Sequence, residues 1–199
     1  MRVLIDAGHG IDTPGKRSPD GAFLEYLFNR SIAEKVYSVL EEQGWDVDLV
    51  VNETNDAALK TRVRRVNDVC RLVGSHNVLL LSIHSNAAGN GKNWMDAQGF
   101  ECYTTKGKTR SDIAAQGMYT AFSEVFPGRR MRVDLSDGDK DKESDFYIIR
   151  HTSCPAVLLE CFFYDNKEEC RWLLKEETQW EIARAIVKGI GYYHGSEYH

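Results

Sequence analysis

The sequence predicts a single α/β domain built on a twisted, mostly parallel sheet of five or six strands, with helices on both faces. Three observations predict this class. Short apolar segments of strand length alternate with longer amphipathic segments, as they do where helices connect parallel strands. The length of 199 residues falls within the usual size of one domain. Because no repeat and no Pro/Ser-rich linker divides the chain, we expect residues 1–199 to form that one domain.

The first half of the chain supplies three of the expected strands and two of the helices. Apolar residues at a four-residue step between Leu24 and Leu40 predict an amphipathic helix, which Gly44 ends. The segment Val78–Ile83 is apolar almost throughout, which is typical of a central strand buried on both faces. In chain order, the expected elements are a strand at Val3–Ile5, this first helix, a strand at Asp46–Val51, a helix from an N-cap at Asp56 to about Val73, and the strand at Val78–Ile83.

The second half continues the alternation and contains the longest irregular segment. In chain order, we expect a strand at Gly99–Thr104, a helix at Ser111–Phe126, strands at Phe146–Ile149 and Ala156–Leu159, and two helices within residues 167–199. The polar loop Pro127–Asp145 carries charges of both signs and is long enough for a functional or mobile segment. Its arginines either face solvent or contact a substrate.

Composition excludes several classes of function. The net charge of −5 argues against nucleic-acid binding through a basic face. No apolar stretch approaches the roughly 20 residues needed to cross a bilayer, so we expect no membrane insertion. The five cysteines form no C-x-x-C pair and their number is odd, which argues against a disulfide framework or a thiolate zinc site. Most of them should be small buried residues.

Two histidines and two glutamates stand where a metal-hydrolase site requires them. His9, His84 and Glu160 lie at or just past the end of apolar strand-like segments, and Glu25 lies on the helix that follows the first strand. Because the carboxyl ends of parallel strands line the ligand crevice of an open sheet, these side chains can meet there. Imidazole and carboxylate groups bind Zn²⁺, and catalytic zinc sites usually have three protein ligands with a position open for water. His9, Glu25 and His84 fit that count.

Two of these residues also have an ordinary structural interpretation. Glu25 could be a solvated first-turn glutamate favoured by the helix dipole. His84 could be a hydrogen-bonded core histidine. Glu160 is harder to explain, because it follows Ala-Val-Leu-Leu and would carry charge into a place of low dielectric. Beside a zinc-bound water it could accept a proton and pass it to a leaving amine.

Other polar residues near these positions have simpler expected roles. Asp6, at the end of the first strand, is expected to be hydrogen-bonded rather than a direct ligand. Arg62 and Asn67 lie on the second expected helix, where surface ion pairing or capping is the default. His76 and His151 are expected to lie at the surface.

The order and spacing of six motifs resemble those of zinc-dependent N-acetylmuramoyl-L-alanine amidases, found among bacterial cell-wall remodelling enzymes and phage endolysins. In chain order they are D-x-G-H-G at Asp6–Gly10, Glu25 with Asn29 one turn on, L-x-x-R-x-x-x-x-N at Leu59–Asn67, S-I-H-x-N-A at Ser82–Ala87, Gly-x-Glu at Gly99–Glu101, and P-A-V-L-L-E at Pro155–Glu160. The resemblance implies His9, Glu25 and His84 as zinc ligands and Glu160 as the catalytic glutamate. Many relatives have Gly-Phe after that glutamate, where this chain has Cys161-Phe162, and Thr-Arg after the second strand, where it has Val51-Asn52.

The resemblance also implies a substrate and a reaction. The expected reaction is hydrolysis of the amide that joins the lactyl group of N-acetylmuramic acid to the L-alanine of a peptidoglycan stem peptide. Zinc would polarise the carbonyl and lower the pKa of its water, and Glu160 would move the proton. Two alternatives remain: a degenerate domain that binds peptidoglycan without cutting it, and a zinc peptidase or deacylase acting on another small amide.

The start of the chain bears on where the protein acts. Met1-Arg2 leads straight into the first strand, with no signal-peptide core. The expected substrate lies outside the cytoplasmic membrane. We therefore expect either a phage or prophage lysin released at lysis or a trimmed form of a secreted enzyme.

Overall fold

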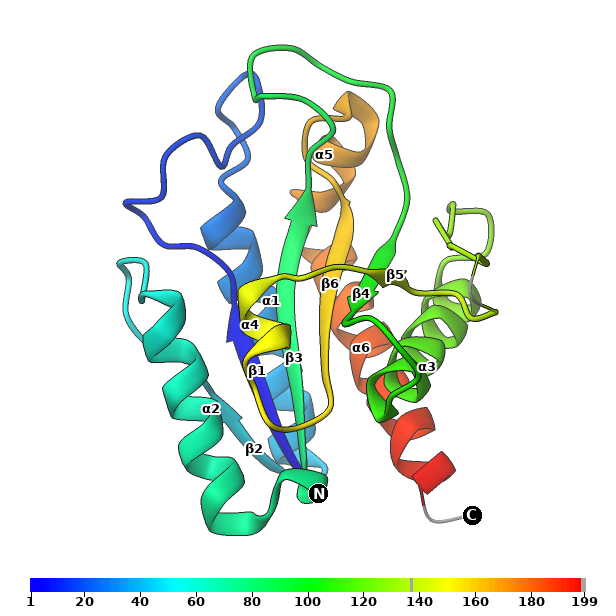
Figure 1. Cartoon of the computed structure of the whole chain (residues 1–199). Helices are drawn as coiled ribbons and strands as arrows, with labels where there is room; N and C mark the ends of the chain where they lie inside the picture. The colour runs from blue at the N-terminus through cyan, green and yellow to red at the C-terminus, as the bar shows by residue number, and fades with distance from the viewer. Residues whose placement is uncertain (137, 198–199) are drawn as a thin grey trace.

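A six-stranded, mostly parallel sheet forms the centre of the protein, as Figure 1 shows. The computed structural model describes residues 1–136 and 138–197. The strands are β1 (Arg2–Ala7), β2 (Asp46–Leu49), β3 (Val78–Asn86), β4 (Glu101–Thr104), β5 (Lys142–Glu143) and β6 (Ala156–Phe163). The helices are α1 (Glu25–Glu42), α2 (Leu59–Val73), α3 (Arg110–Val125), α4 (Tyr147–Arg150), α5 (Lys167–Leu173) and α6 (Glu176–Glu197), with a 3-10 turn at Ser75–Asn77.

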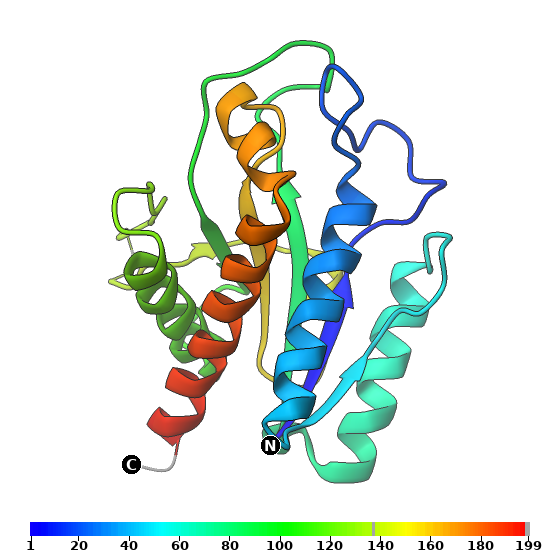
Figure 2. The same cartoon turned by 180° about the vertical axis from the view of Figure 1, so that it is seen from behind.

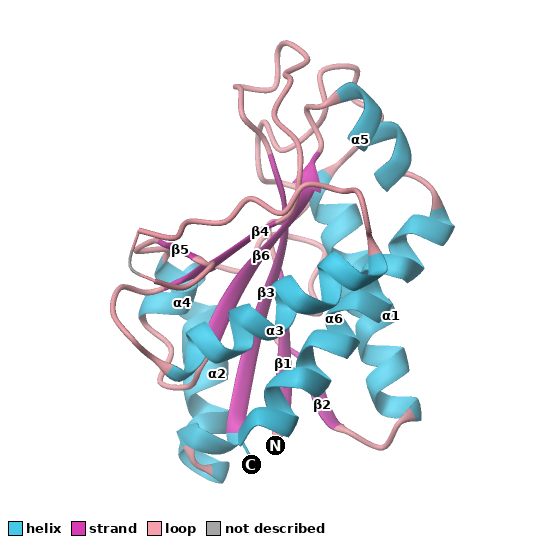
Figure 3. Ribbon diagram, turned by 90° about the vertical axis from the view of Figure 1, so that its right-hand side faces the viewer, coloured by secondary structure: helices cyan, strands magenta, loops and turns pink. Residues whose placement is uncertain are grey.

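The strand order is β2-β1-β3-β6-β4-β5, so that β1, β3 and β6 lie side by side within the sheet. Strands β2, β1, β3 and β6 run parallel to one another, whereas β4 is antiparallel to β6 and β5 is parallel to β4. The carboxyl ends of β1, β3 and β6 therefore face the same way, and loops gather beyond the arrowheads of β3 and β6 (Figure 3). This confirms the predicted sheet and places the ends of its central strands together.

Helices pack on both faces of the sheet, as predicted. Figure 2 faces the layer formed by α1, α3 and α6, whose apolar residues form one core with alternate residues of β1, β3 and β6. The opposite face is covered by α2 and α4, which pack on the other set of strand residues. Strand residues alternate between the two cores: Ile5 and Leu81 belong to the larger core, Leu4 and Leu80 to the smaller. All five cysteines are buried in these cores.

The structure corrects three predicted details. The segment predicted as a strand at Phe146–Ile149 is the short helix α4, and its residues Ile148 and Ile149 are buried against the second core. An apolar run this short has no distinguishing period. Asp56 does not cap α2, which begins after Ala58. Strand β6 extends to Phe163, so that Glu160 lies inside the strand rather than after it. Of the charged loop, residue 137 lies outside the described residues, as do 198 and 199 at the predicted last helix.

Within the described part of the chain, no helix is both long enough and apolar enough to span a membrane.

Candidate metal centre

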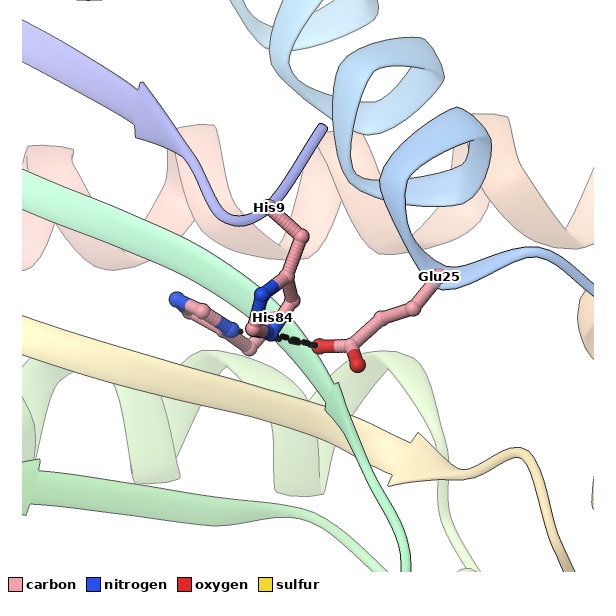
Figure 4. A group of neighbouring side chains, drawn as sticks. All are labelled: His9, Glu25 and His84. Atoms are coloured by element: carbon pink, nitrogen blue, oxygen red, sulfur yellow. Dashed lines mark hydrogen bonds and ion pairs between the residues drawn. The ribbon is translucent and has the colours of Figure 1, made fainter. Parts of the chain in front are cut away.

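His9, Glu25 and His84 converge at the carboxyl edge of the sheet, as Figure 4 shows. His9 lies in the turn after β1, Glu25 is the first residue of α1, and His84 lies near the end of β3. Glu25 Oε1 is 3.1 Å from His84 Nδ1 and 3.3 Å from His9 Nε2. One potential ligand atom from each residue lies within 4.8 Å of the others. The structure thus brings the three expected ligand candidates together from three separate elements.

These distances fit a tetrahedral cation site. Zn²⁺ lies about 2.0–2.2 Å from nitrogen and oxygen ligands, and tetrahedral angles then separate neighbouring ligand atoms by roughly 3.3 Å. Two buried ligand atoms, His9 Nε2 and Glu25 Oε2, have no hydrogen bond of good geometry, although Glu25 Oε1 lies 3.3 Å from the first and Lys16 Nζ 3.7 Å from the second. Buried polar atoms left in this way are uncommon and call for a partner. The donor set of two imidazoles and one carboxylate suits a zinc ion.

The Glu25 carboxylate is buried and lies against both histidines. Its side chain is only 1% exposed. Burial by itself would raise the pKa of Glu25, but hydrogen bonds and charge from His84 and His9 outweigh it and hold that pKa well below its usual range. Burial would likewise lower the pKa of His84, and the carboxylate of Glu25 reverses that effect and raises it. The alternative interpretation of Glu25 as a solvated glutamate is therefore wrong.

The turn that carries His9 is held in an unusual backbone conformation. His9 has φ of 65°, in the left-handed region that costs a residue with a Cβ atom of order 1–3 kcal/mol. Hydrogen bonds fix the turn: Asn29 Nδ2 donates to the Gly8 carbonyl, and Arg30 and Arg62 both donate to the His9 carbonyl. Strained residues held in this way commonly lie at functional sites.

Arg62 supports the site from α2, although its expected role was ordinary surface pairing. Its side chain is 2% exposed and pairs with Asp6 at 2.6 Å and Asp56 at 2.8 Å. It also donates to the carbonyl of Ala7 at 2.7 Å, so that it ties α2 to the end of β1. A sequence signal existed: Arg62, Val66 and Cys70 share a four-residue step, and the last two are buried. Asp6 is hydrogen-bonded, as expected, to Arg62 and Ser82.

Glu160 lies beside this cluster on the neighbouring strand. In the parallel pairing of β3 and β6, Glu160 is directly opposite His84. Its Oε2 atom is buried and makes no hydrogen bond. Burial raises the pKa of Glu160 to about 8, with His84 opposing that shift and Glu25 adding to it. A carboxyl group with such a pKa can hold or release a proton near neutral pH.

A second buried glutamate, Glu101, lies on the side of Glu160 opposite to His84. Glu101 pairs with Glu160 across β4 and β6 and is 2% exposed. It accepts hydrogen bonds from Arg132, from Lys142 at 2.8 Å and from Asn86 at 2.7 Å. Burial would raise the pKa of Glu101, but these partners lower it overall. The charged loop thus folds back to neutralise a buried carboxylate, a role that its composition alone did not reveal.

Two cavities reach the site and share no lining residue. The first, about 400 Å³, is lined by His9, His84 and Arg62, with α2 and Ile148 of α4 forming its wall. The second, about 240 Å³, is lined by Glu160, Lys16, Asn86 and Tyr164 together with neighbouring loop residues. A chain-like substrate could therefore occupy space on both sides of the reacting bond.

The sequence matches known proteins over nearly its whole length. Residues 3–192 match the family described as N-acetylmuramoyl-L-alanine amidase. The uncharacterized protein YqiI of Bacillus subtilis is 30% identical over 96% of this chain and 84% of its own. The endolysin of Bacillus phage SPP1 is 30% identical over 94% of this chain, which spans 64% of that endolysin.

Solved structures match equally well. The catalytic domain of CwlV, an N-acetylmuramoyl-L-alanine amidase from Bacillus (Paenibacillus) polymyxa var. colistinus, superposes with a TM-score of 0.77 and 28% identity, covering 98% of each chain. An N-acetylmuramoyl-L-alanine amidase from Clostridium difficile 630 gives a TM-score of 0.79 and 30% identity, covering 98% of this chain and 97% of that one. The shared fold therefore extends over the whole domain.

Proposed function

Because the chain belongs to the N-acetylmuramoyl-L-alanine amidase family, we propose that it hydrolyses the amide bond between N-acetylmuramic acid and L-alanine in peptidoglycan. Membership of this family agrees with the resemblance found in the sequence motifs. The single observation that carries the proposal is the meeting of His9, Glu25 and His84 at the sheet edge, directly beside the strand position of Glu160. The cell wall, where peptidoglycan lies, is then the place of action.

We propose that His9, Glu25 and His84 hold a zinc ion. The ligand spacing, the buried atoms without hydrogen bonds and the His/Glu/His donor set support this assignment. When bound, zinc supplies a Lewis acid that polarises the substrate carbonyl and makes a water molecule more acidic. The protein's own contribution is to hold the three ligands, and Asn29, Arg30 and Arg62 do so by fixing the turn at His9.

We propose Glu160 as the group that moves the proton. Its carboxylate accepts a proton from the attacking water while the water oxygen bonds to the amide carbon. The same carboxyl then donates that proton to the amide nitrogen as the carbon–nitrogen bond breaks, and a free amino group leaves. The products are the lactyl carboxylate of N-acetylmuramic acid and a peptide that begins with L-alanine. Glu160 lies directly opposite His84 on the neighbouring strand, and its buried Oε2 atom makes no hydrogen bond, which supports this role.

Digestion of purified peptidoglycan tests the reaction. We expect new amino-terminal alanine to appear, and to disappear when a chelator removes the metal and return when zinc is added back. Fragments ending at any other bond would instead favour a peptidase or a deacylase. Binding to the wall without any new amino terminus would favour the degenerate binding domain.

Two substitutions separate the roles of metal ligand and proton carrier. Glu160→Ala should retain zinc and lose activity by about 10²- to 10⁴-fold, the usual contribution of acid–base catalysis. His84→Ala should lose both zinc and activity, because two ligands hold the ion poorly. His76→Ala, at an exposed histidine outside the cluster, is the control and should change neither. Zinc content by mass spectrometry and release of alanine are the measurements, and a fully active Glu160→Ala protein would overturn the role given to Glu160.

A further inference from the structure

The cavity beside Glu160 contains one positively charged side chain. Among its lining residues, all within the described part of the chain, Lys16 alone is a lysine or arginine. The other polar groups of the wall include Asn86, Asn90 and Tyr164. A cation among neutral hydrogen-bonding groups suits a ligand that carries a carboxylate.

The chemistry of the proposed reaction decides which part of the substrate enters this cavity. Glu160 must reach the amide nitrogen to protonate it as the bond breaks. The leaving side of the substrate, which is the stem peptide, therefore lies toward the cavity that Glu160 lines. The acyl side, which carries the sugar, then lies toward the cavity lined by His9 and His84.

Lys16 has a fixed backbone and a side chain with room to move. Its carbonyl accepts a hydrogen bond of 3.0 Å from the backbone N–H of Glu25, and Arg17 forms a β-bridge with Leu24. The loop that carries it is thereby tied to the start of α1. The side chain is 43% exposed, and its Nζ lies 3.7 Å from Glu25 Oε2. The side chain lines the cavity beside Glu160 and also the neighbouring cavity formed by residues 11–17, Leu24 and Tyr26.

The proposed substrate carries its next acidic group a short distance beyond the leaving nitrogen. A residue that follows L-alanine places its α-carboxyl group about two residues, roughly 7 Å, from the leaving nitrogen. Lys16 and Glu160 line the same cavity. The ammonium group of Lys16 can therefore serve the same substrate whose amine Glu160 protonates.

We propose that Lys16 determines specificity by binding the α-carboxylate of an acidic second residue in the stem peptide. This inference rests on the proposed function. The enzyme then prefers a peptide with a γ-linked D-glutamyl residue over the same peptide in which the α-carboxylate is a carboxamide.

Two synthetic substrates test the inference. Both contain N-acetylmuramoyl-L-alanyl-γ-D-glutamyl-L-lysine, and they differ only in an α-carboxylate or an α-carboxamide on the glutamyl residue. We expect kcat/KM to favour the carboxylate by about tenfold, the usual effect of a charge-assisted hydrogen bond. Lys16→Gln should reduce that ratio to about twofold or less. Arg17→Gln is the matched control: it removes a positive charge from the same loop but not from this cavity, and should leave the ratio unchanged.

A binding measurement supplies a readout that does not depend on turnover. In the Glu160→Ala background, calorimetry should show tighter binding of the carboxylate substrate, and adding Lys16→Gln should remove that difference. An equal kcat/KM for both substrates, or a preference that survives Lys16→Gln, contradicts the inference and leaves the amidase proposal standing. Failure to cleave either substrate contradicts the amidase proposal, and the inference with it.

Discussion

Gly8 shows how closely the site depends on single residues. A Cβ atom at Gly8 would lie 2.1 Å from Cε1 of His84 and 2.5 Å from its Nδ1. Contacts that short cannot exist, so that the ring of His84 has its place only because residue 8 lacks a side chain. The glycine in D-x-G-H-G therefore serves the histidine on the next strand as well as its own turn.

Gly8→Ala should damage metal binding more than folding. We expect zinc affinity to fall at least tenfold, because the displaced imidazole of His84 no longer points at the other two ligands. Gly191→Ala is the matched control, since a Cβ atom there meets nothing within 4 Å and the residue lies inside α6. Competition with a zinc-binding dye measures the zinc affinity of both variants. Unchanged affinity in Gly8→Ala would show that the ring of His84 is not needed where the structure places it.

The sequence predicted where the candidate ligands lie, but not which residues hold the surrounding structure in place. His9, Glu25 and His84 were predictable because strand ends and the following helix meet at one edge of a parallel sheet. Arg62 and Glu101 were not, because their partners lie on other elements and only the folded chain brings them together. The sequence did contain a signal for each: Arg62 stands among the apolar residues of its helix, and Glu101 stands within a strand.

The buried ion pair between Arg62 of α2 and Asp6 of β1 should contribute strongly to stability. Arg62→Ala leaves Asp6 buried without its cation, and should lower the free energy of unfolding by about 3–5 kcal/mol. Arg65→Ala, three residues on, removes an exposed pair with Glu53 and should cost at most about 1 kcal/mol. Urea denaturation of both variants measures the difference. Equal effects would mean that α2 is not fastened to the sheet through Arg62.

Phe162 combines aromatic packing with backbone strain. Its φ is 66°, and its ring contacts Phe126 and Trp172 at centroid distances of 5.6 and 4.8 Å. Replacing the ring by Ala should cost about 3–5 kcal/mol. Phe162→Gly should be as stable as Phe162→Ala or up to about 1 kcal/mol more stable, because glycine adopts a positive φ without strain.

Phe100 is the control for this comparison, since it is equally buried in the same aromatic cluster and is not among the residues with positive φ. There we expect the usual order, with glycine less stable than alanine by about 0.5–1 kcal/mol. Thermal denaturation of the four variants decides the question. The same order at both positions would refute the claim of strain at Phe162.

Element prediction succeeded where a period was long enough to read. The four-residue step in α1 and the apolar run of β3 were recognisable because tertiary packing agrees with the local pattern. The helix α4 was missed because four residues carry no period, and its apolar pair Ile148 and Ile149 suits either a strand or a helical turn. The strand β5, two residues long, exists only because β4 lies beside it.

For the molecule as a whole, buried carboxyl groups should link stability to pH. In the folded, zinc-free protein the pKa of Glu160 is raised from 4.5 to about 8, and that of Asp141 from 3.8 to about 6, chiefly by burial. Above about pH 4.5 the unfolded chain has released these protons while the folded chain retains them. Stability therefore falls as pH rises toward 8. The lowered pKa of Glu25 acts in the opposite sense, but only as pH falls below about 4.5.

We therefore expect chelator-treated protein to be more stable at pH 6 than at pH 8. Each retained proton contributes up to about 1.4 kcal/mol per pH unit. Urea unfolding at the two pH values measures the effect. Glu160→Gln should remove most of it, because its amide does not titrate. Greater stability at pH 8 in the chelator-treated protein would contradict the burial of Glu160 as a protonated carboxyl group.

In the proposed site, one cation joins the turn after β1, the start of α1 and the end of β3. Anomalous diffraction at the zinc edge from zinc-loaded crystals tests it most directly. We expect one strong peak about 2.0–2.2 Å from a nitrogen of His9, a nitrogen of His84 and a carboxylate oxygen of Glu25. A peak held by other residues, or no peak at these three, would contradict it.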